Sequence, residues 1–178
     1  MKFLKDLLFI DVQTTGSDPD KDVVIQIAAS LVDRDNFLEK QHFNTYVRIS
    51  LLDSTLSKYA ENIGVDYDVL RKSPKLPEAL KLLQDTFGQE VFLVTFSSLY
   101  QSYLRNSFKK ASIPYPFDHH ILDLWTLSYI YTLHLGFKKV PSIHTLAEIF
   151  NLKLKNQFDA MERVKVQSEI FGKIIKAL

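Results

Sequence analysis

Residues 7–16 have the sequence LLFIDVQTTG, and this stretch determines how the rest of the chain is interpreted. The apolar run at residues 7–10 is typical of a buried β-strand. Side chains alternate between the two faces of a strand, so we expect Asp11 and Gln13 on one face at the strand's end. Gly16 permits a sharp turn, because glycine accepts backbone conformations that other residues avoid. The stretch therefore predicts a core strand that carries two polar side chains to the edge of a sheet.

Two more strands are predicted directly after this one. Residues 23–29 form a β-branched apolar run that follows a turn rich in Asp, Pro and Gly. Residues 37–49 are more polar but include Phe43, Tyr46 and Val47, which is typical of an outer antiparallel strand with one face in water. The chain is therefore expected to begin with three consecutive strands.

From Ser54 onwards the sequence predicts helices that alternate with two short strands, at residues 91–94 and 121–124. The expected helices are one over residues 78–84 with Gly88 at its end, one capped by Ser97 or Ser98, an aromatic one to about Leu135, one opened by Ser142, and a last one from near Gln157. We therefore predict a single α/β domain over residues 1–178. Its mixed five-stranded sheet has three leading antiparallel strands, then parallel strand-helix units, with helices on its flanks.

The composition excludes several classes of protein. The 22 basic and 21 acidic side chains give a formal charge of +1, so no overall field attracts the chain to nucleic acid or to an anionic membrane. The absence of cysteine excludes a disulfide framework, a thiolate zinc site and a cysteine nucleophile. Charged residues interrupt the apolar N-terminal run, so we expect no signal peptide, no membrane span and a cytoplasmic location.

Residues 11–16 resemble the first motif of the DEDDh 3′–5′ exonucleases, Asp-x-Glu-Thr-Thr-Gly, at the end of the first strand of an RNase H-like fold. Later segments follow the order found in the proofreading exonuclease subunit of bacterial DNA polymerase III. The similar segments are residues 62–65, 78–80, 93–101, 122–127, 142–150 and 158–164. A resemblance over nearly the whole chain is far more specific than one hexapeptide, and it implies an RNase H-like exonuclease domain.

The resemblance also implies where the family's catalytic site falls in this chain. Family members hold two Mg²⁺ or Mn²⁺ ions with four carboxylates and use a histidine as general base. The carboxylate positions fall on Asp11, Gln13, Gln101 and Arg163, and the histidine position falls on Phe158. Gln offers only a neutral oxygen, Arg repels cations and Phe cannot accept a proton. We therefore expect no metal ion or other cofactor, and a catalytically inactive protein.

Helical spacing places Arg163 inside the apolar arc of the last helix, so this side chain is expected to face the protein. The arc consists of Ala160, Val164, Phe171 and Ile174. Our hypothesis is that the guanidinium fills the volume of the missing ions and pairs with Asp11 within about 6 Å. The alternative is a side chain that lies over apolar surface and reaches water.

The resemblance implies a partner as well, the 3′ end of a single-stranded nucleic acid. Gln13, Thr14 and Thr15 would lie against the terminal nucleotide, while Phe96 and Phe158 would form an apolar wall beside it. A partner protein is the other kind of partner that we expect, and a membrane is not expected.

Local charge supports a nucleic-acid partner in part. Residues 138–178 carry eight basic and four acidic side chains, whereas residues 11–35 carry an excess of acids. Arg105, Lys109 and Lys110 form a further basic cluster that could contact phosphates, although such faces are commonly just solvated.

Two other functions stay open at this level. One is a weak metal-dependent 3′–5′ exonuclease in which Asp11, Asp123 or Asp159 recruits a metal ion in an altered geometry. The other is a structural or protein-docking subunit that does not bind nucleic acid. The adjacent His119 and His120 have no further ligand at metal spacing in the sequence, so structural roles are expected for them.

Overall fold

The computed structural model describes residues 2–49, 53–88 and 90–178. The described residues form a five-stranded mixed sheet with the strand order β3-β2-β1-β4-β5. Its strands are β1 (Asp6–Thr14), β2 (Val24–Val32), β3 (Glu39–Tyr46), β4 (Val91–Thr95) and β5 (Ile121–Asp123). Strands β1, β2 and β3 pair antiparallel, whereas β1 with β4 and β4 with β5 pair parallel. The predicted mixed sheet is confirmed.

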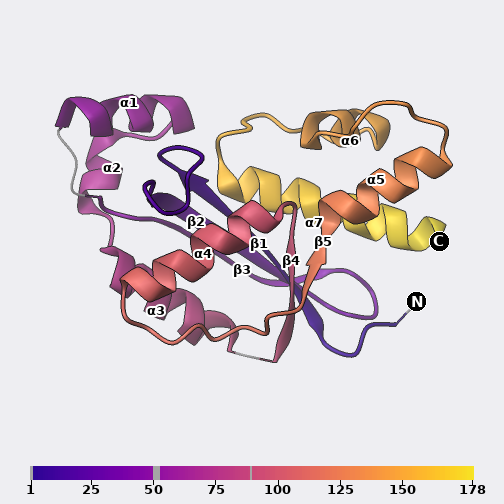
Figure 1. Cartoon of the computed structure of the whole chain (residues 1–178), viewed down its shortest axis with the longest axis horizontal. Coiled ribbons are helices and arrows are strands. Elements are labelled where there is room, and N and C mark those ends of the chain that lie inside the picture. Colours follow the sequence, from indigo (N-terminus) through magenta and orange to yellow (C-terminus); the bar gives the residue numbers. More distant parts are fainter. Residues whose placement is uncertain (1, 50–52, 89) are drawn as a thin grey trace.

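Helices cover both faces of this sheet (Figure 1). They are α1 (Asp53–Ile63), α2 (Tyr67–Lys72), α3 (Leu76–Phe87), α4 (Ser98–Lys110), α5 (Leu124–His134), α6 (Ile143–Ile149) and α7 (Ala160–Ala177). Helix α7 packs across β1 and β2 on one face, with α5 and α6 against it, and α3 and α4 cover the other face. Within the described ranges, no helix combines the length and the apolarity needed to cross a bilayer.

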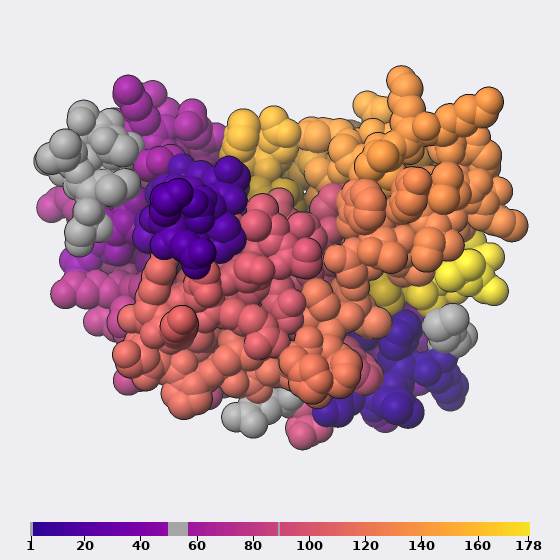
Figure 2. Space-filling model, in the orientation of Figure 1, coloured from indigo at the N-terminus to yellow at the C-terminus, as the bar shows by residue number. Residues whose placement is uncertain are grey.

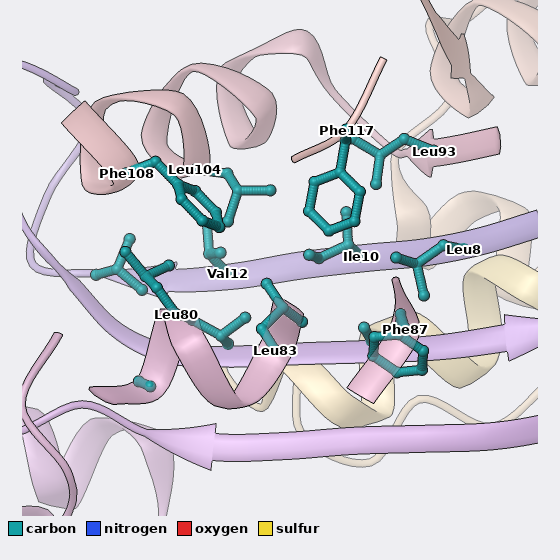
Figure 3. Close-up of a cluster of buried hydrophobic side chains, with 14 of the residues drawn as sticks. Leu8, Ile10, Val12, Leu80, Leu83, Phe87, Leu93, Leu104, Phe108 and Phe117 are labelled. Atoms are coloured by element: carbon teal, nitrogen blue, oxygen red, sulfur yellow. The ribbon is translucent and has the colours of Figure 1, made fainter. Parts of the chain in front are cut away.

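The central strand β1 is buried on both faces, and its side chains alternate between two cores. Leu8, Ile10 and Val12 point towards α3 and α4 (Figure 3). Leu7 and Phe9 point the other way and pack against α7. This strict alternation continues to Asp11 and Gln13, because successive residues of a strand face opposite sides. The sheet therefore carries both polar side chains towards the start of α7, as the sequence predicted.

Several element boundaries differ from the prediction. Strand β2 continues to Val32, three residues beyond the β-branched run, because it stays paired with both β1 and β3. Helix α7 begins at Ala160 rather than near Gln157, because the side chain of Asp159 accepts a hydrogen bond from the Met161 N–H and caps the helix there.

Gly16 is needed for a different reason from the one that the sequence suggested. The glycines with positive φ among the described residues are Gly64, Gly88 and Gly136, so Gly16 is not in the left-handed region. A Cβ atom at Gly16 would instead lie 2.4–2.6 Å from the carboxylate atoms of Asp22. Close approach of that side chain, and not backbone conformation, is what excludes larger residues here.

Candidate functional site

Asp11 lies near the C-terminal end of β1, on the face covered by α7, and its side chain is fully buried. Arg163, in the first turn of α7, donates from Nε to Oδ2 of Asp11 at 3.0 Å and from Nη2 to Oδ1 at 2.8 Å. A guanidinium that binds both oxygens of one carboxylate is a strong and directional contact. The hypothesis of an Asp11–Arg163 pair is therefore confirmed. The alternative of a solvent-reaching Arg163 is wrong, because only 5% of the residue is exposed.

Each of the five N–H groups of the Arg163 guanidinium has an acceptor. Besides the two bonds to Asp11, Nη1 donates to Oε1 of Gln13 at 3.0 Å and to the carbonyl of Gln157 at 2.6 Å. Nη2 also donates to the carbonyl of Val12 at 3.0 Å. These acceptors belong to the end of β1 and to the turn before α7. The side chain therefore ties the strand to the helix and keeps no N–H free for another ligand.

Two residues that the sequence interpretation missed complete the surroundings of this pair. Gln167, one helical turn after Arg163, is buried and donates from Nε2 to Oδ2 of Asp11 at 2.5 Å. The ring of Tyr100 on α4 has its centre 5.8 Å from the guanidinium carbon of Arg163. The sequence could have indicated Gln167, because it lies four residues after Arg163 and residues at this spacing share a helix face. Tyr100 was not, because its position depends on how α4 crosses the sheet.

The charges of the pair support each other. Burial disfavours the charged guanidinium, but the neighbouring Asp11 carboxylate outweighs burial and raises the pKa of Arg163 above its usual value. Burial also raises the pKa of the Tyr100 hydroxyl, with a smaller contribution in the same direction from Asp11 and an opposing one from Arg163. Arg163 therefore stays a cation, and Tyr100 a neutral phenol, throughout the physiological pH range.

Gln101 and Phe158 do not join the pair. Gln101 lies on α4 beside Tyr100, and its Nε2 atom is buried without a hydrogen-bond partner among the described residues. Phe158 lies in the turn before α7, is 44% exposed, and donates its N–H to the Asn156 side chain. Of the five predicted site positions, the structure thus brings Asp11, Gln13 and Arg163 into direct contact, and it leaves Phe158 at the surface in the turn before α7.

Thr14 is the last residue of β1 and Thr15 begins the turn after it, and hydrogen bonds hold both side chains. The Thr14 hydroxyl donates to the carbonyl of Gly16 at 2.6 Å, and the Thr15 hydroxyl donates to Asp22 at 3.0 Å. The Tyr59 hydroxyl from α1 donates to the Thr15 carbonyl at 2.8 Å. Both threonine side chains are half-buried, so this turn presents a fixed polar edge.

Phe96, the other residue predicted for an apolar wall, directly follows β4. Its ring is half-buried and packs against the core on the α7 side of the sheet. Phe158 is therefore the more accessible of the two aromatic residues.

The two acids that could have recruited a metal ion in an altered site are both helix caps. Asp159 accepts hydrogen bonds from the Met161 N–H at 2.8 Å and from Nε2 of Gln26 at 3.0 Å. Asp123 accepts one from the Thr126 N–H at 2.7 Å at the start of α5. Capping carboxylates of this kind stabilise the helix start through its unpaired N–H groups.

Two of the three residues in the predicted basic cluster on α4 have internal partners. Lys110 donates from Nζ to the carbonyls of Pro19, Asp20 and Asp22, at 3.2–3.4 Å, and so fixes the loop between β1 and β2. The guanidinium carbon of Arg105 lies 4.4 Å from the centre of a neighbouring tyrosine ring. Only Lys109 of this cluster points outwards without such a role in the described part of the chain, so the cluster is mainly structural.

Asp118 joins His119 and His120 in one exposed group, with ligand-type atoms within 4.8 Å of one another. The Asp118 carboxylate accepts from the N–H and from Nδ1 of His120, both at 2.8 Å. The backbone N–H is the main cause that lowers the pKa of Asp118, and the His120 ring adds to it. These bonds describe the arrangement as a local turn, and Asp118 is a further ligand-type group beside the two histidines that the sequence interpretation did not count.

Comparisons with known proteins agree with this architecture. The family model described as exonuclease (RNase_T) matches residues 8–170. The chain is 27% identical over 177 residues to a PolC-type DNA polymerase III of Caldanaerobacter subterraneus subsp. tengcongensis (strain DSM 15242 / JCM 11007 / NBRC 100824 / MB4). That match includes 97% of this chain but 12% of the polymerase, so the chain spans about an eighth of the length of its curated relative.

Two solved structures show the same fold. The nuclease domain of 3′hExo, a DEDDh family member bound to rAMP, has a TM-score of 0.75 at 17% identity, with 99% of this chain and 95% of that one covered. Exonuclease I of E. coli in complex with a dT13 oligonucleotide has a TM-score of 0.73 at 17% identity, with 97% and 41% covered. The mixed sheet with helices on both faces is thus the RNase H-like fold that the resemblance implied. The chain belongs to the exonuclease (RNase_T) family.

Proposed function

We propose that this chain is an exonuclease-fold domain that binds the 3′ end of single-stranded nucleic acid in DNA or RNA metabolism without hydrolysing it. One observation carries the proposal. Arg163, which the resemblance assigns to the family's fourth carboxylate position, holds both oxygens of Asp11 through its guanidinium, and Asp11 is the one acid left at the four assigned metal positions.

The residues present do not fit a pair of divalent cations. Mg²⁺ and Mn²⁺ need several anionic oxygens, and each oxygen of Asp11 already accepts hydrogen bonds. The side-chain oxygen of Gln13 likewise accepts from Arg163. A fixed cation at the centre also repels any incoming metal ion. No metal-dependent step therefore enters the proposal.

A general base is missing as well. Phe158 stands at the family's histidine position, and its ring has no atom that accepts a proton. Residues that act together in catalysis depend on one another, so the loss of one removes most of the rate enhancement. Loss of both the metal site and the base therefore leaves negligible hydrolysis.

The same substitutions favour binding without metal. Four unneutralised carboxylates would repel a phosphate backbone, whereas a neutral Asp11–Arg163 pair does not. The fixed polar edge at Thr14 and Thr15 supplies hydrogen-bonding groups for a terminal nucleotide, and the exposed ring of Phe158 supplies a surface for base stacking. The fold relatives bound to rAMP and to dT13 support this choice of ligand.

The test is a binding and cleavage experiment on one labelled strand. A 5′-fluorescein oligothymidine with a free 3′ end is titrated with the protein in EDTA and again with Mn²⁺, and the strand's length is followed on a denaturing gel. We expect equal binding in both buffers, weaker binding at higher salt, and no shortening. Phe158→Ala is expected to weaken binding about tenfold through lost stacking. Leu38→Ala, at a 66% exposed residue in the β2–β3 turn, is the matched control.

Each other outcome identifies a different function. Shortening that requires Mn²⁺ and disappears in Asp11→Ala would establish a weak exonuclease. Absence of binding at low salt would establish a structural or protein-docking subunit.

A further inference from the structure

Helix α5 and the loop after it form a surface of unusual composition. The segment between Asp123 and Glu148 contains no acidic residue, although acids and bases are balanced over the whole chain. Its inner side is buried through Leu124, Ser128 and Thr132, and α5 packs against α7 there (Figure 1). A helix that is apolar on its outer side as well is typical of one that has a further contact.

The outer side exposes several large apolar side chains close together in the chain. They are Ile130 (61% exposed), Leu133 (50%), Leu135 (47%), Phe137 (41%) and Val140 (64%). The exposed Lys138 and Lys139 lie among them in sequence. We call these seven residues the α5 face. Figure 2 shows this part of the chain, in orange, as a protruding shoulder of the molecule.

A cavity of about 430 Å³ opens beside the α5 face. Its lining includes Thr132, Phe137, Lys138, Lys139, Pro141 and Ile149. Phe137, Pro141 and Ile149 therefore bring apolar groups to a space large enough for an apolar side chain, and two lysines belong to the same lining. This arrangement suits a ligand that has an apolar anchor with carboxylates next to it.

We propose that the α5 face binds an acidic, amphipathic segment of a partner protein. An apolar side chain of that segment enters the cavity, its other apolar side chains cover Leu135 and Val140, which neighbour the lining residues in the chain, and its carboxylates meet Lys138 and Lys139. Apolar contact supplies the affinity and the complementary charges fix the orientation. Helix-in-groove recognition by one amphipathic face is a common mode for such a surface.

Charge and composition favour this occupant over the others. A second copy of the chain would bring two basic faces together without an acid between them, and like charges at an interface are costly. A nucleic acid would use cations and aromatic rings, whereas the most exposed residues here are the aliphatic Ile130 and Val140. The site is also independent of the Asp11–Arg163 pair, so it does not rest on the function proposed above.

The chain contains its own reporter for binding. Trp125 is the only tryptophan, its indole N–H donates to the Pro141 carbonyl at 3.2 Å, and its ring stacks on Tyr129 at 5.3 Å between centres. Pro141 lines the cavity, so occupation of the cavity should change the fluorescence of Trp125.

The experiment titrates the whole protein with a synthetic amphipathic peptide that has leucines on one helical face and glutamates beside them. A matched peptide has lysines in place of the glutamates. We expect the acidic peptide to bind at least tenfold more tightly than the basic one. The double variant Lys138→Glu and Lys139→Glu should reverse this preference. Val140→Asp, between the lining residues Lys139 and Pro141, is expected to abolish binding. Lys81→Glu and Leu82→Asp, on the exposed side of α3, are the matched controls and should change nothing.

Three results would overturn the proposal. The first is equal binding, or no binding, of the two peptides to a protein whose circular dichroism is native. The second is a dimer in solution that Val140→Asp dissociates, which would assign the face to a second copy. The third is binding of the oligothymidine that depends on Lys138 and Lys139, which would assign the face to nucleic acid.

Discussion

Asp11 and Arg163 are 152 positions apart in the chain, yet Arg163 binds both carboxylate oxygens of Asp11 in a contact that water does not reach. The pair joins the central strand to the helix that covers it. Here one side chain of the protein links them.

Removal of the cation should leave a buried, uncompensated acid. We expect Arg163→Ala to lower the free energy of unfolding by about 3–5 kcal/mol, because the charge of Asp11 would keep only Gln167 as a side-chain partner. Urea unfolding followed by circular dichroism measures the loss. Arg71→Ala, which breaks an exposed pair on α2, should cost less than about 1 kcal/mol. Similar losses in both variants would contradict a buried pair.

Restoring acids should restore affinity for metal. Arg163→Asp combined with Gln13→Glu would place two further carboxylates beside Asp11, which repel each other until a cation binds. We expect this protein to be less stable than the wild type in EDTA and to gain melting temperature with Mn²⁺, because a ligand that binds the folded state stabilises it. The control combines Gln13→Glu with Lys165→Asp, a substitution at an exposed position of α7. An equal gain in both proteins would show that Mn²⁺ acts elsewhere.

The two glycines Gly16 and Gly172 should respond to alanine in opposite directions. In Gly16→Ala the new Cβ overlaps the Asp22 carboxylate, which holds Thr15 and the Asp18 N–H, so we expect a loss of about 1–3 kcal/mol. In Gly172→Ala, inside α7, the nearest heavy atom lies 3.9 Å away and helix propensity should add up to about 1 kcal/mol. Thermal unfolding of the two variants tests both signs. A double variant, Gly16→Ala with Asp22→Ala, that regains part of the stability lost in Gly16→Ala would confirm the steric cause.

Tyr100 should contribute to the alkaline limit of stability. Burial raises its pKa in the folded state, so the folded protein keeps this proton at a pH where the unfolded chain releases it. Its contribution is therefore complete below the unfolded pKa of about 10 and is lost as pH rises above that value. We expect stability to fall less steeply above about pH 10 in Tyr100→Phe than in the wild type. Identical slopes in urea unfolding across this range would contradict the prediction.

The sequence by itself determined the elements and the faces that they present. The run at residues 7–10 predicted a buried strand, and the period of two along that strand assigned Asp11 and Gln13 to one face. The arc of α7 likewise placed Arg163 inside. These are local properties, because the spacing of side chains along a strand or a helix follows from backbone geometry alone.

Tertiary structure alone decided which groups meet. Nothing in the sequence marks the carbonyls of Val12 and Gln157 as acceptors for Arg163, Tyr100 as its ring neighbour, or Lys110 as the anchor of the β1–β2 loop. All of these contacts except the one to Gln157 join elements that are remote in the chain. Their meeting depends on the packing of whole helices against the sheet, which is set by the shapes of the two cores and by no single residue.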